Sequence, residues 1–174
     1  CPSAAVRQFM DTELGYDLNL WKRICDQMYW QGLLVPENYG GLGLGYVELV
    51  AILEQMGRYL CCSPFYGSIC LGVNALLVAG TEQQKTIFLP QILAGKTATI
   101  AYTGEAGGWD SHSIQTSYKK QGDSYCLNGT YRFVPDGHSA DILVLAAREE
   151  GAQGEEGISL FILPTKTSGI TREW

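Results

Sequence analysis

The stretch GKTATIAYTGEAGGWD, residues 95–110, marks the point where the pattern of this 174-residue sequence changes. Before it, apolar residues recur at helical spacing; after it, β-branched and aromatic residues form short runs between turn signals. The stretch itself begins as such a run and passes into a loop with three glycines. We therefore expect two domains, a helical domain over residues 1–96 and a β-domain over residues 97–174.

Three apolar segments predict the main helices of the first domain. Residues 17–30 carry apolar side chains three and four positions apart, and Gly32 follows as a helix stop. Residues 46–60 are apolar on nearly every side, which predicts a helix buried on more than one face. Residues 68–80 predict a further buried helix, which Gly80 ends.

A capping box predicts where the last helix of this domain begins. Thr81 and Gln84 have the T-x-x-Q spacing in which each side chain bonds the other residue's backbone N–H. We expect a short helix through about Phe88, then one more turn that Pro90 opens and Gly95 closes.

The runs after the boundary predict strands over 97–103, 114–120, 124–134, 141–147 and 158–164. The QGD of residues 121–123 and the NG of residues 128–129 are hairpin signals. Short strands at close spacing favour antiparallel pairing, so the expected fold class is α+β: an all-α N-terminal domain followed by an antiparallel, β-barrel-like middle domain. An uncapped helix-like start and a strand-like end at residues 169–174 lead us to expect a piece of a larger protein, with the β-domain truncated.

The composition argues against several classes of protein. A net charge of −6 without a basic stripe argues against nucleic-acid binding. No apolar run reaches about eighteen residues and no signal peptide is visible, so we expect no membrane span. The two histidines and the six cysteines lack the spacing of a metal site or disulfide framework, so we expect no metal and a reducing compartment: the cytoplasm, or the mitochondrial matrix in a eukaryote. The cysteines are Cys1, Cys25, Cys61, Cys62, Cys70 and Cys126.

Two glycine-rich stretches differ in what they can bind. GGLGLG, residues 40–45, lacks the G-x-G-x-x-G spacing because Tyr46 stands where the third glycine is needed, and we interpret it as a tight turn. The loop after Thr103 offers backbone N–H groups, a hydroxyl and the flat side chains of Tyr102 and Trp109, which suit an anion or the polar edge of a ring system. From these residues alone, a structural turn is as good an interpretation as a binding site.

Over almost its whole length the chain resembles the N-terminal and middle domains of the acyl-CoA dehydrogenases. Several motifs in register carry the resemblance. They are WQGLLVPENYGGLGL (30–44), LEQMGR (53–58), GTEQQK (80–85), LPQILAG (89–95), AYTGEAGGWD (101–110), LNGTYRFVPDGHSAD (127–141) and SLFILP (159–164).

The resemblance implies a fold, a cofactor and a reaction. Such proteins add a C-terminal four-helix bundle to these two domains, assemble as homo- or hetero-oligomers, and hold FAD with its isoalloxazine against the middle domain. A glutamate removes the proton α to the thioester carbonyl of an acyl-CoA, and a hydride leaves the β-carbon for the flavin. That glutamate is expected beyond residue 174, so no residue of this chain is nominated as the catalytic base.

The resemblance also assigns residues of this chain to FAD. Ile100, Tyr102 and Thr103 fall where backbone groups and a threonine hydroxyl meet the pyrimidine side of the flavin. Gly108 matches the pattern of the following loop, while Trp109 replaces a small serine near FAD and the thioester arm of CoA. A tryptophan there is expected either to wall off that space or to stack on something.

A second flavin-contacting segment in the family reads Trp-Ile-Thr/Ser-Asn, and here Phe133, Val134, Pro135 and Asp136 stand in its place. Phe133 can keep a ring contact. Pro135 supplies neither a hydroxyl nor an N–H, so two hydrogen bonds to the reactive edge of the cofactor are expected to be lost, each worth about 1 kcal/mol net.

These assignments support two main hypotheses. The favoured one is a fragment of an FAD-dependent acyl-CoA dehydrogenase-like oxidoreductase that α,β-dehydrogenates a CoA thioester, inactive when isolated. The alternative is a non-catalytic partner subunit, or flavin-poor paralogue, in a hetero-oligomer of the same family. Three departures from the family pattern motivate it: Gly104, Trp109 and Pro135. An oxidase or flavin monooxygenase-like branch is a third possibility.

Overall fold

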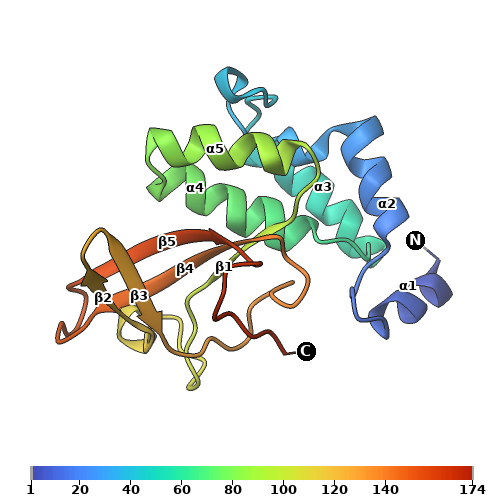
Figure 1. Ribbon diagram of the computed structural model, residues 1–174. Coiled ribbons are helices and arrows are strands. Elements are labelled where there is room, and N and C mark those ends of the chain that lie inside the picture. Colours follow the sequence, from blue (N-terminus) through green and yellow to red (C-terminus); the bar gives the residue numbers. More distant parts are fainter. Residues whose placement is uncertain (1, 174) are drawn as a thin grey trace.

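The computed structural model describes residues 2–173, so Cys1 and Trp174 lie outside the described residues. Figure 1 shows helices gathered on one side of a twisted sheet, with α4 between α5 and the strands β4 and β5. The helical elements are α1 (Ser3–Met10), α2 (Leu18–Arg23), η1 (Ile24–Met28), η2 (Trp30–Gly32), η3 (Glu37–Tyr39), α3 (Tyr46–Arg58), η4 (Tyr66–Val73), α4 (Asn74–Ala79), α5 (Glu82–Leu93) and η5 (Ser111–Ser113). Within residues 2–173, no helix combines the length and apolarity that a bilayer crossing needs.

The helix expected over 17–30 is present, but it ends as a π-helix. Asp17 caps α2, because its carboxylate accepts hydrogen bonds from the N–H groups of Asn19 at 2.9 Å and Leu20 at 3.1 Å. The helix passes directly into η1 and stops at Tyr29, whose φ of 56° lies in the left-handed region. The stop therefore comes before Gly32 rather than at it.

The expectation that α3 is buried on several faces is wrong. Only Leu49 is fully buried, and the side chains of Ile52, Leu53 and Met56 pack partly against the same core. These positions form a single stripe at helical spacing. Val47 on the outer side is 81% exposed, so the apolar outer face of α3 has no covering element among the described residues.

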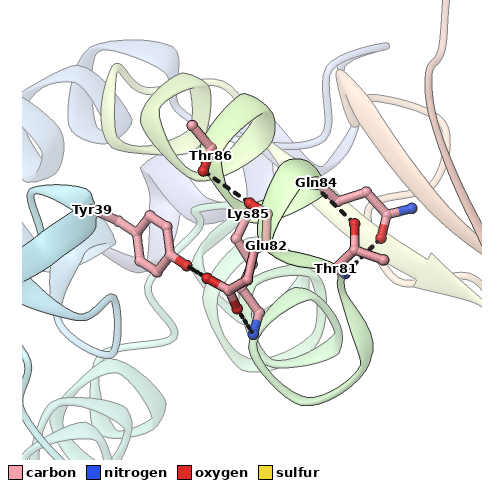
Figure 2. A network of polar contacts seen from close by, with 6 residues as sticks. All are labelled: Tyr39, Thr81, Glu82, Gln84, Lys85 and Thr86. Atoms are coloured by element: carbon pink, nitrogen blue, oxygen red, sulfur yellow. Dashed lines mark hydrogen bonds and ion pairs between the residues drawn. The ribbon is translucent and has the colours of Figure 1, made fainter.

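The capping box before α5 is confirmed. The Thr81 N–H bonds the Gln84 side chain at 2.8 Å, and the Gln84 N–H bonds the Thr81 hydroxyl at 3.2 Å (Figure 2). The prediction that the helix stops near Phe88 is wrong, because α5 runs without a break through Pro90 to Leu93. Burial of Leu89 and Ile92 in the core stabilises this last turn, although Pro90 contributes no N–H to it.

The glycine-rich stretch after η3 is a tight turn, as the sequence predicts. A Cβ on Gly41 would lie 1.9 Å from the backbone oxygen of Val35, so only glycine fits there. Tyr39 in this segment donates a hydrogen bond to the Glu82 carboxylate, which also pairs with Lys85 at 3.1 Å (Figure 2). These contacts attach the turn to the first turn of α5.

The buried helix expected over 68–80 consists of the π-helix η4 and the α-helix α4, and its small residues let it lie directly on the sheet. The Ser68 hydroxyl accepts a hydrogen bond from the Ala98 N–H at 3.1 Å. A Cβ on Gly72 would lie 2.6 Å from the Ala98 Cβ. The main core fills this contact and includes Ile69, Val73 and Ile142.

The sheet is mixed rather than an antiparallel barrel. It consists of β1 (Ala98–Ala101), β2 (Ser117–Gln121), β3 (Ser124–Asn128), β4 (Ile142–Glu149) and β5 (Ile158–Pro164). β4 pairs parallel with β1 and, at its end, with β2; it pairs antiparallel with β5, and β2 pairs antiparallel with β3. The first six residues of β4 are buried, as expected of a central strand covered on both faces. Whether β1 and β4 run parallel depends on the long connection between them. The alternation of apolar and polar residues along a strand does not reveal this direction.

One of the two predicted hairpins is present. Gly122 and Asp123 connect β2 to β3, and Gly122 takes a φ of 62° that suits a two-residue hairpin turn. The strand expected over 124–134 ends at Asn128, and the chain then leaves the sheet without a second hairpin. Where the chain leaves the sheet, Gly129 passes close to Thr116. A Cβ at this position would lie 2.4 Å from the Thr116 hydroxyl oxygen, so the path requires a glycine.

Candidate functional site

Two segments that are distant in the sequence lie side by side at the end of β1. The Thr99 hydroxyl donates a hydrogen bond to the Pro135 carbonyl oxygen at 2.7 Å. Further along, the Arg132 N–H donates to the Thr103 carbonyl oxygen at 3.0 Å. The fold thus brings together the two groups of residues that the resemblance assigns to FAD.

Thr103 is buried, with 3% of its surface exposed, and its hydroxyl donates to the Arg132 carbonyl oxygen. The hydroxyl proton is therefore already used inside the protein. Thr103 here joins the two segments, and in this arrangement it does not offer a hydrogen-bond donor to a ligand.

Ile100 lines an open groove between the helices and the sheet. Side chains alternate along β1, so Ile100 lies on the same side as Ala98, which contacts η4. The groove has a volume of about 340 Å³ and is lined by Cys70, Leu71, Asn74, Ala75, Val78, Ala79, Ile100 and Leu160. These side chains are mainly apolar, so the groove suits a hydrocarbon group.

The two polar side chains of the groove are not free for chemistry. Asn74 accepts a hydrogen bond from the Tyr46 hydroxyl and donates to the Cys70 carbonyl oxygen, both at 2.9 Å. Burial raises the pKa of the Cys70 thiol to about 11, which keeps it neutral at physiological pH. The groove therefore provides a surface for binding rather than a nucleophile.

Exposed aromatic rings surround the loop that follows β1. Tyr102 and Trp109 meet edge to face, with ring centroids 5.5 Å apart, and Trp109 remains 77% exposed. Phe133 is 74% exposed, and its ring lies over Gly107, where a Cβ would come within 3.2 Å of it. Trp109 therefore contacts Tyr102 by an edge rather than by stacking, and its role toward a ligand stays a prediction.

The rest of the loop is shaped by close packing. A Cβ on Gly108 would lie 1.8 Å from the Ser113 hydroxyl oxygen, which explains the glycine without a ligand. The Asp110 carboxylate caps the turn η5 by accepting hydrogen bonds from the N–H of Ser113 at 3.0 Å and from its hydroxyl at 3.2 Å. Gly108 is thus a structural residue of the loop, whatever ligand the loop faces.

The segment from Phe133 to Asp136 is a turn rather than the end of a strand. Phe133 and Asp136 both have left-handed backbone conformations, with φ values of 56° and 54°. Val134 packs partly against the small core on the other face of the sheet, and its carbonyl oxygen accepts from the Gly137 N–H at 3.0 Å. This places the Pro135 carbonyl against Thr99 and leaves the Phe133 ring exposed.

Asp136 makes a contact that sequence reasoning missed. Its carboxylate faces the backbone N–H of Gly67, in the first turn of η4, and a Cβ on Gly67 would lie 2.5 Å from the Asp136 Oδ2. Burial raises the pKa of this carboxyl, while the Gly67 N–H and the charge of His138 act against the rise. The local signal in the sequence is a glycine directly before the helix predicted over residues 68–80, and this glycine does not indicate which residue it contacts.

Comparisons with known proteins cover nearly the whole chain. The N-terminal domain of acyl-CoA dehydrogenases matches residues 3–96, and the middle domain of the same enzymes matches residues 99–174. The chain belongs to the acyl-CoA dehydrogenase family. An acyl-CoA dehydrogenase from Bacillus subtilis is 33% identical over 143 residues, which make up 80% of this chain and 38% of that protein.

Two solved structures have the same fold as this chain. The acyl-CoA dehydrogenase of Bacillus anthracis, complexed with FAD, aligns with a TM-score of 0.78 at 26% identity over 97% of this chain and 28% of that one. The ChsE4–ChsE5 complex of Mycobacterium tuberculosis aligns with a TM-score of 0.78 at 26% identity over 95% of this chain and 43% of that one. FAD is the cofactor of family homologues.

The residues present fit the ring of a flavin better than its polar edge. The exposed ring of Phe133 and the side of β1 that carries Ile100 offer apolar surface. The Thr103 hydroxyl is already bonded, and Pro135 has no N–H. The site therefore suits FAD through its apolar contacts, with fewer donors than the resemblance assigns.

Proposed function

We propose that this chain is the N-terminal and middle part of an FAD-dependent oxidoreductase that introduces a double bond between the α- and β-carbons of an acyl-CoA thioester. One observation supports the proposal most strongly. The end of β1 and the segment 132–135, which carry the residues assigned to FAD, are hydrogen-bonded to each other beside an apolar groove.

Each part of the site has a role in this proposal. Bound FAD supplies the acceptor for the hydride that leaves the β-carbon. Ile100, Tyr102 and Phe133 bind and orient the flavin ring, and the groove beside Ile100 binds the hydrocarbon chain and excludes water from it. The base that takes the α-proton is proposed to lie outside these 174 residues. The chain spans 38% of the Bacillus subtilis relative, so the activity belongs to the larger protein.

Replacing the exposed ring of Phe133 tests the flavin assignment. We expect Phe133→Ala to weaken FAD binding about tenfold, because a lost aromatic contact is worth about 0.5–1.5 kcal/mol beyond its buried area. Quenching of FAD fluorescence during titration of the purified protein gives the dissociation constant. Tyr59→Ala is the control, since Tyr59 is a similarly exposed aromatic residue, at the end of α3. Equal affinities of the Phe133 variant and the control would remove Phe133 from the site.

A second candidate function is a non-catalytic partner subunit in a hetero-oligomer. The bonded hydroxyl of Thr103 and the missing donor of Pro135 favour it, because both reduce the polar contacts to a flavin. One solved structure of similar fold is itself a complex, formed by ChsE4 and ChsE5. A protein that stays colourless with added FAD, yet raises the activity of a flavin-containing partner, would favour this function over the first.

The cysteines bear on the cellular compartment that we propose for this protein. We place the protein in a reducing compartment, the cytoplasm or the mitochondrial matrix, because Cys25, Cys61, Cys62, Cys70 and Cys126 are all free thiols.

A further inference from the structure

Asp136 joins the turn that carries Phe133 to the helix that carries the groove. The contact is close, because Gly67 leaves no room for a Cβ between the helix backbone and the carboxylate. A carboxylate oxygen facing an N–H in the first turn of a helix satisfies a donor that has no partner within the helix. Since η4 runs on to Cys70 and Leu71, the same helix forms a wall of the groove.

The turn around Asp136 is fixed by its backbone as well. The Asp136 carbonyl oxygen accepts hydrogen bonds from the N–H groups of Ala140 at 2.9 Å and Ser139 at 3.1 Å, and Thr99 holds the carbonyl oxygen of Pro135. These bonds tie the turn to the sheet domain. The Asp136 side chain ties the same turn to the helical domain, so it sets the position of the turn relative to η4.

The surroundings of the carboxylate are mostly neutral or acidic. From η4, the Gly67 N–H faces it, and His138 on its own segment contributes a favourable charge. Burial raises the pKa of Tyr16 and of Cys62 in the N-terminal domain, and the charge of Asp136 adds to both rises. The charge of Asp141 also raises the pKa of Tyr16, whereas Asp17 lowers the pKa of Cys62 through a backbone hydrogen bond and raises it through its charge. Burial therefore opposes the charged form of Asp136, whereas the Gly67 N–H and the charge of His138 favour it.

We propose that Asp136 is a positioning residue: its side chain fixes the Phe133–Pro135 turn against the first turn of η4 and so sets the distance between the flavin-facing ring and the wall of the groove. Its role toward the cofactor rests on the proposed function. The contact between the two domains does not.

Three substitutions of Asp136 separate the effects of its charge, its hydrogen-bond acceptor and its size. Asp136→Asn keeps the shape and an oxygen acceptor for the Gly67 N–H without the charge, Asp136→Leu keeps the size without an acceptor, and Asp136→Ala removes both. We expect Asn to retain the contact and the other two to lose it. Asp110→Ala is the matched control, because Asp110 caps the turn η5 through Ser113 rather than Gly67.

The first measurement needs no cofactor. Hydrogen exchange of the Gly67 amide, followed by NMR in the purified protein, is expected to speed up tenfold or more in the Ala and Leu variants. It should stay within about twofold of the wild type in the Asn variant and in the Asp110 control. Amides of β4 should be unchanged in all of them, which shows that the variants are folded. Unchanged exchange at Gly67 in the Ala and Leu variants would overturn the contact.

The second measurement concerns FAD. We expect the dissociation constant to rise about tenfold for Asp136→Ala and to be restored by Asp136→Asn.

The outcomes distinguish this inference from the proposed function. If the wild type binds FAD and the Ala variant binds it equally well, the positioning role is wrong while the proposed function stands. If the wild type binds no FAD but Gly67 exchange responds as expected, the proposed function fails while the domain contact stands.

Discussion

The carbonyl oxygen of Pro135 accepts a hydrogen bond from the Thr99 hydroxyl, and its ring nitrogen has no proton to donate. Because the residue lies in a turn that follows β3, no ladder hydrogen bond is lost and the fold tolerates the proline. The missing N–H instead affects the contact with a ligand. A residue that resemblance places at the edge of a flavin offers that edge no donor.

Restoring the donors at this position is expected to tighten FAD binding. Pro135→Thr adds a hydroxyl and an N–H, two hydrogen bonds of about 1 kcal/mol each, which together correspond to an increase in affinity of up to roughly thirtyfold. Pro135→Ala is the matched control, since it adds the N–H alone and should give a smaller gain. The two dissociation constants come from FAD titration. A Thr variant that binds no more tightly than the Ala variant would show that no hydroxyl contact forms there.

Sequence reasoning at the scale of single residues found the types of side chain but not their partners. It assigned the Thr103 hydroxyl to a flavin, whereas the structure places that hydroxyl on the Arg132 carbonyl oxygen. It found Asp136 only as a replacement for an asparagine, and the contact with Gly67 joins two domains. Partners of this kind depend on the tertiary fold, which no local pattern contains.

At the scale of elements, the contact of η4 with β1 decides how the two domains meet. Gly72 and Ser68 bring the helix backbone close enough for the Ser68 hydroxyl to bond the Ala98 N–H. Larger residues on this side of the helix would push it away from the strand and open the main core, which includes Ile69 and Val73.

A methyl group at this contact is expected to destabilise the protein. Gly72→Ala would place a Cβ 2.6 Å from the Ala98 Cβ and 3.1 Å from the Ala98 carbonyl carbon, which cannot both move aside. Overpacking of this kind costs about 1–3 kcal/mol of unfolding free energy, measurable by urea denaturation. Gly57→Ala in α3 is the control, because nothing lies within 4 Å of the added methyl, and it should stabilise by about 0.4–1 kcal/mol. Similar unfolding energies for both variants would contradict a tight contact.

Elements with local causes were predicted from the sequence, and those with distant causes were not. The capping box of Thr81 and Gln84 and the hairpin at Gly122 depend on neighbouring residues, and both are confirmed. The continuation of α5 through Pro90 depends on burial of the last turn, and the parallel pairing of β1 with β4 depends on the whole connection between them. Those two features were predicted wrongly for that reason.

At the scale of the whole molecule, one side of the helical domain carries an apolar surface. Val47 and Val50 of α3 are 81% and 60% exposed, and Val78 of α4, at the groove, is 82% exposed. The Tyr46 hydroxyl bonds Asn74 of the groove, so the two parts are adjacent. Surfaces of this kind mark interaction sites. They agree with the proposal that the larger protein, rather than these 174 residues, carries out the reaction.

The central claim is that the protein carrying this chain is a flavoprotein, and the visible absorption spectrum of the purified, full-length protein tests it most directly. We predict a yellow protein with bound-flavin absorbance, or a colourless one that acquires this absorbance on incubation with FAD and keeps it through gel filtration. A protein that remains colourless and retains no FAD after the same treatment would contradict the account.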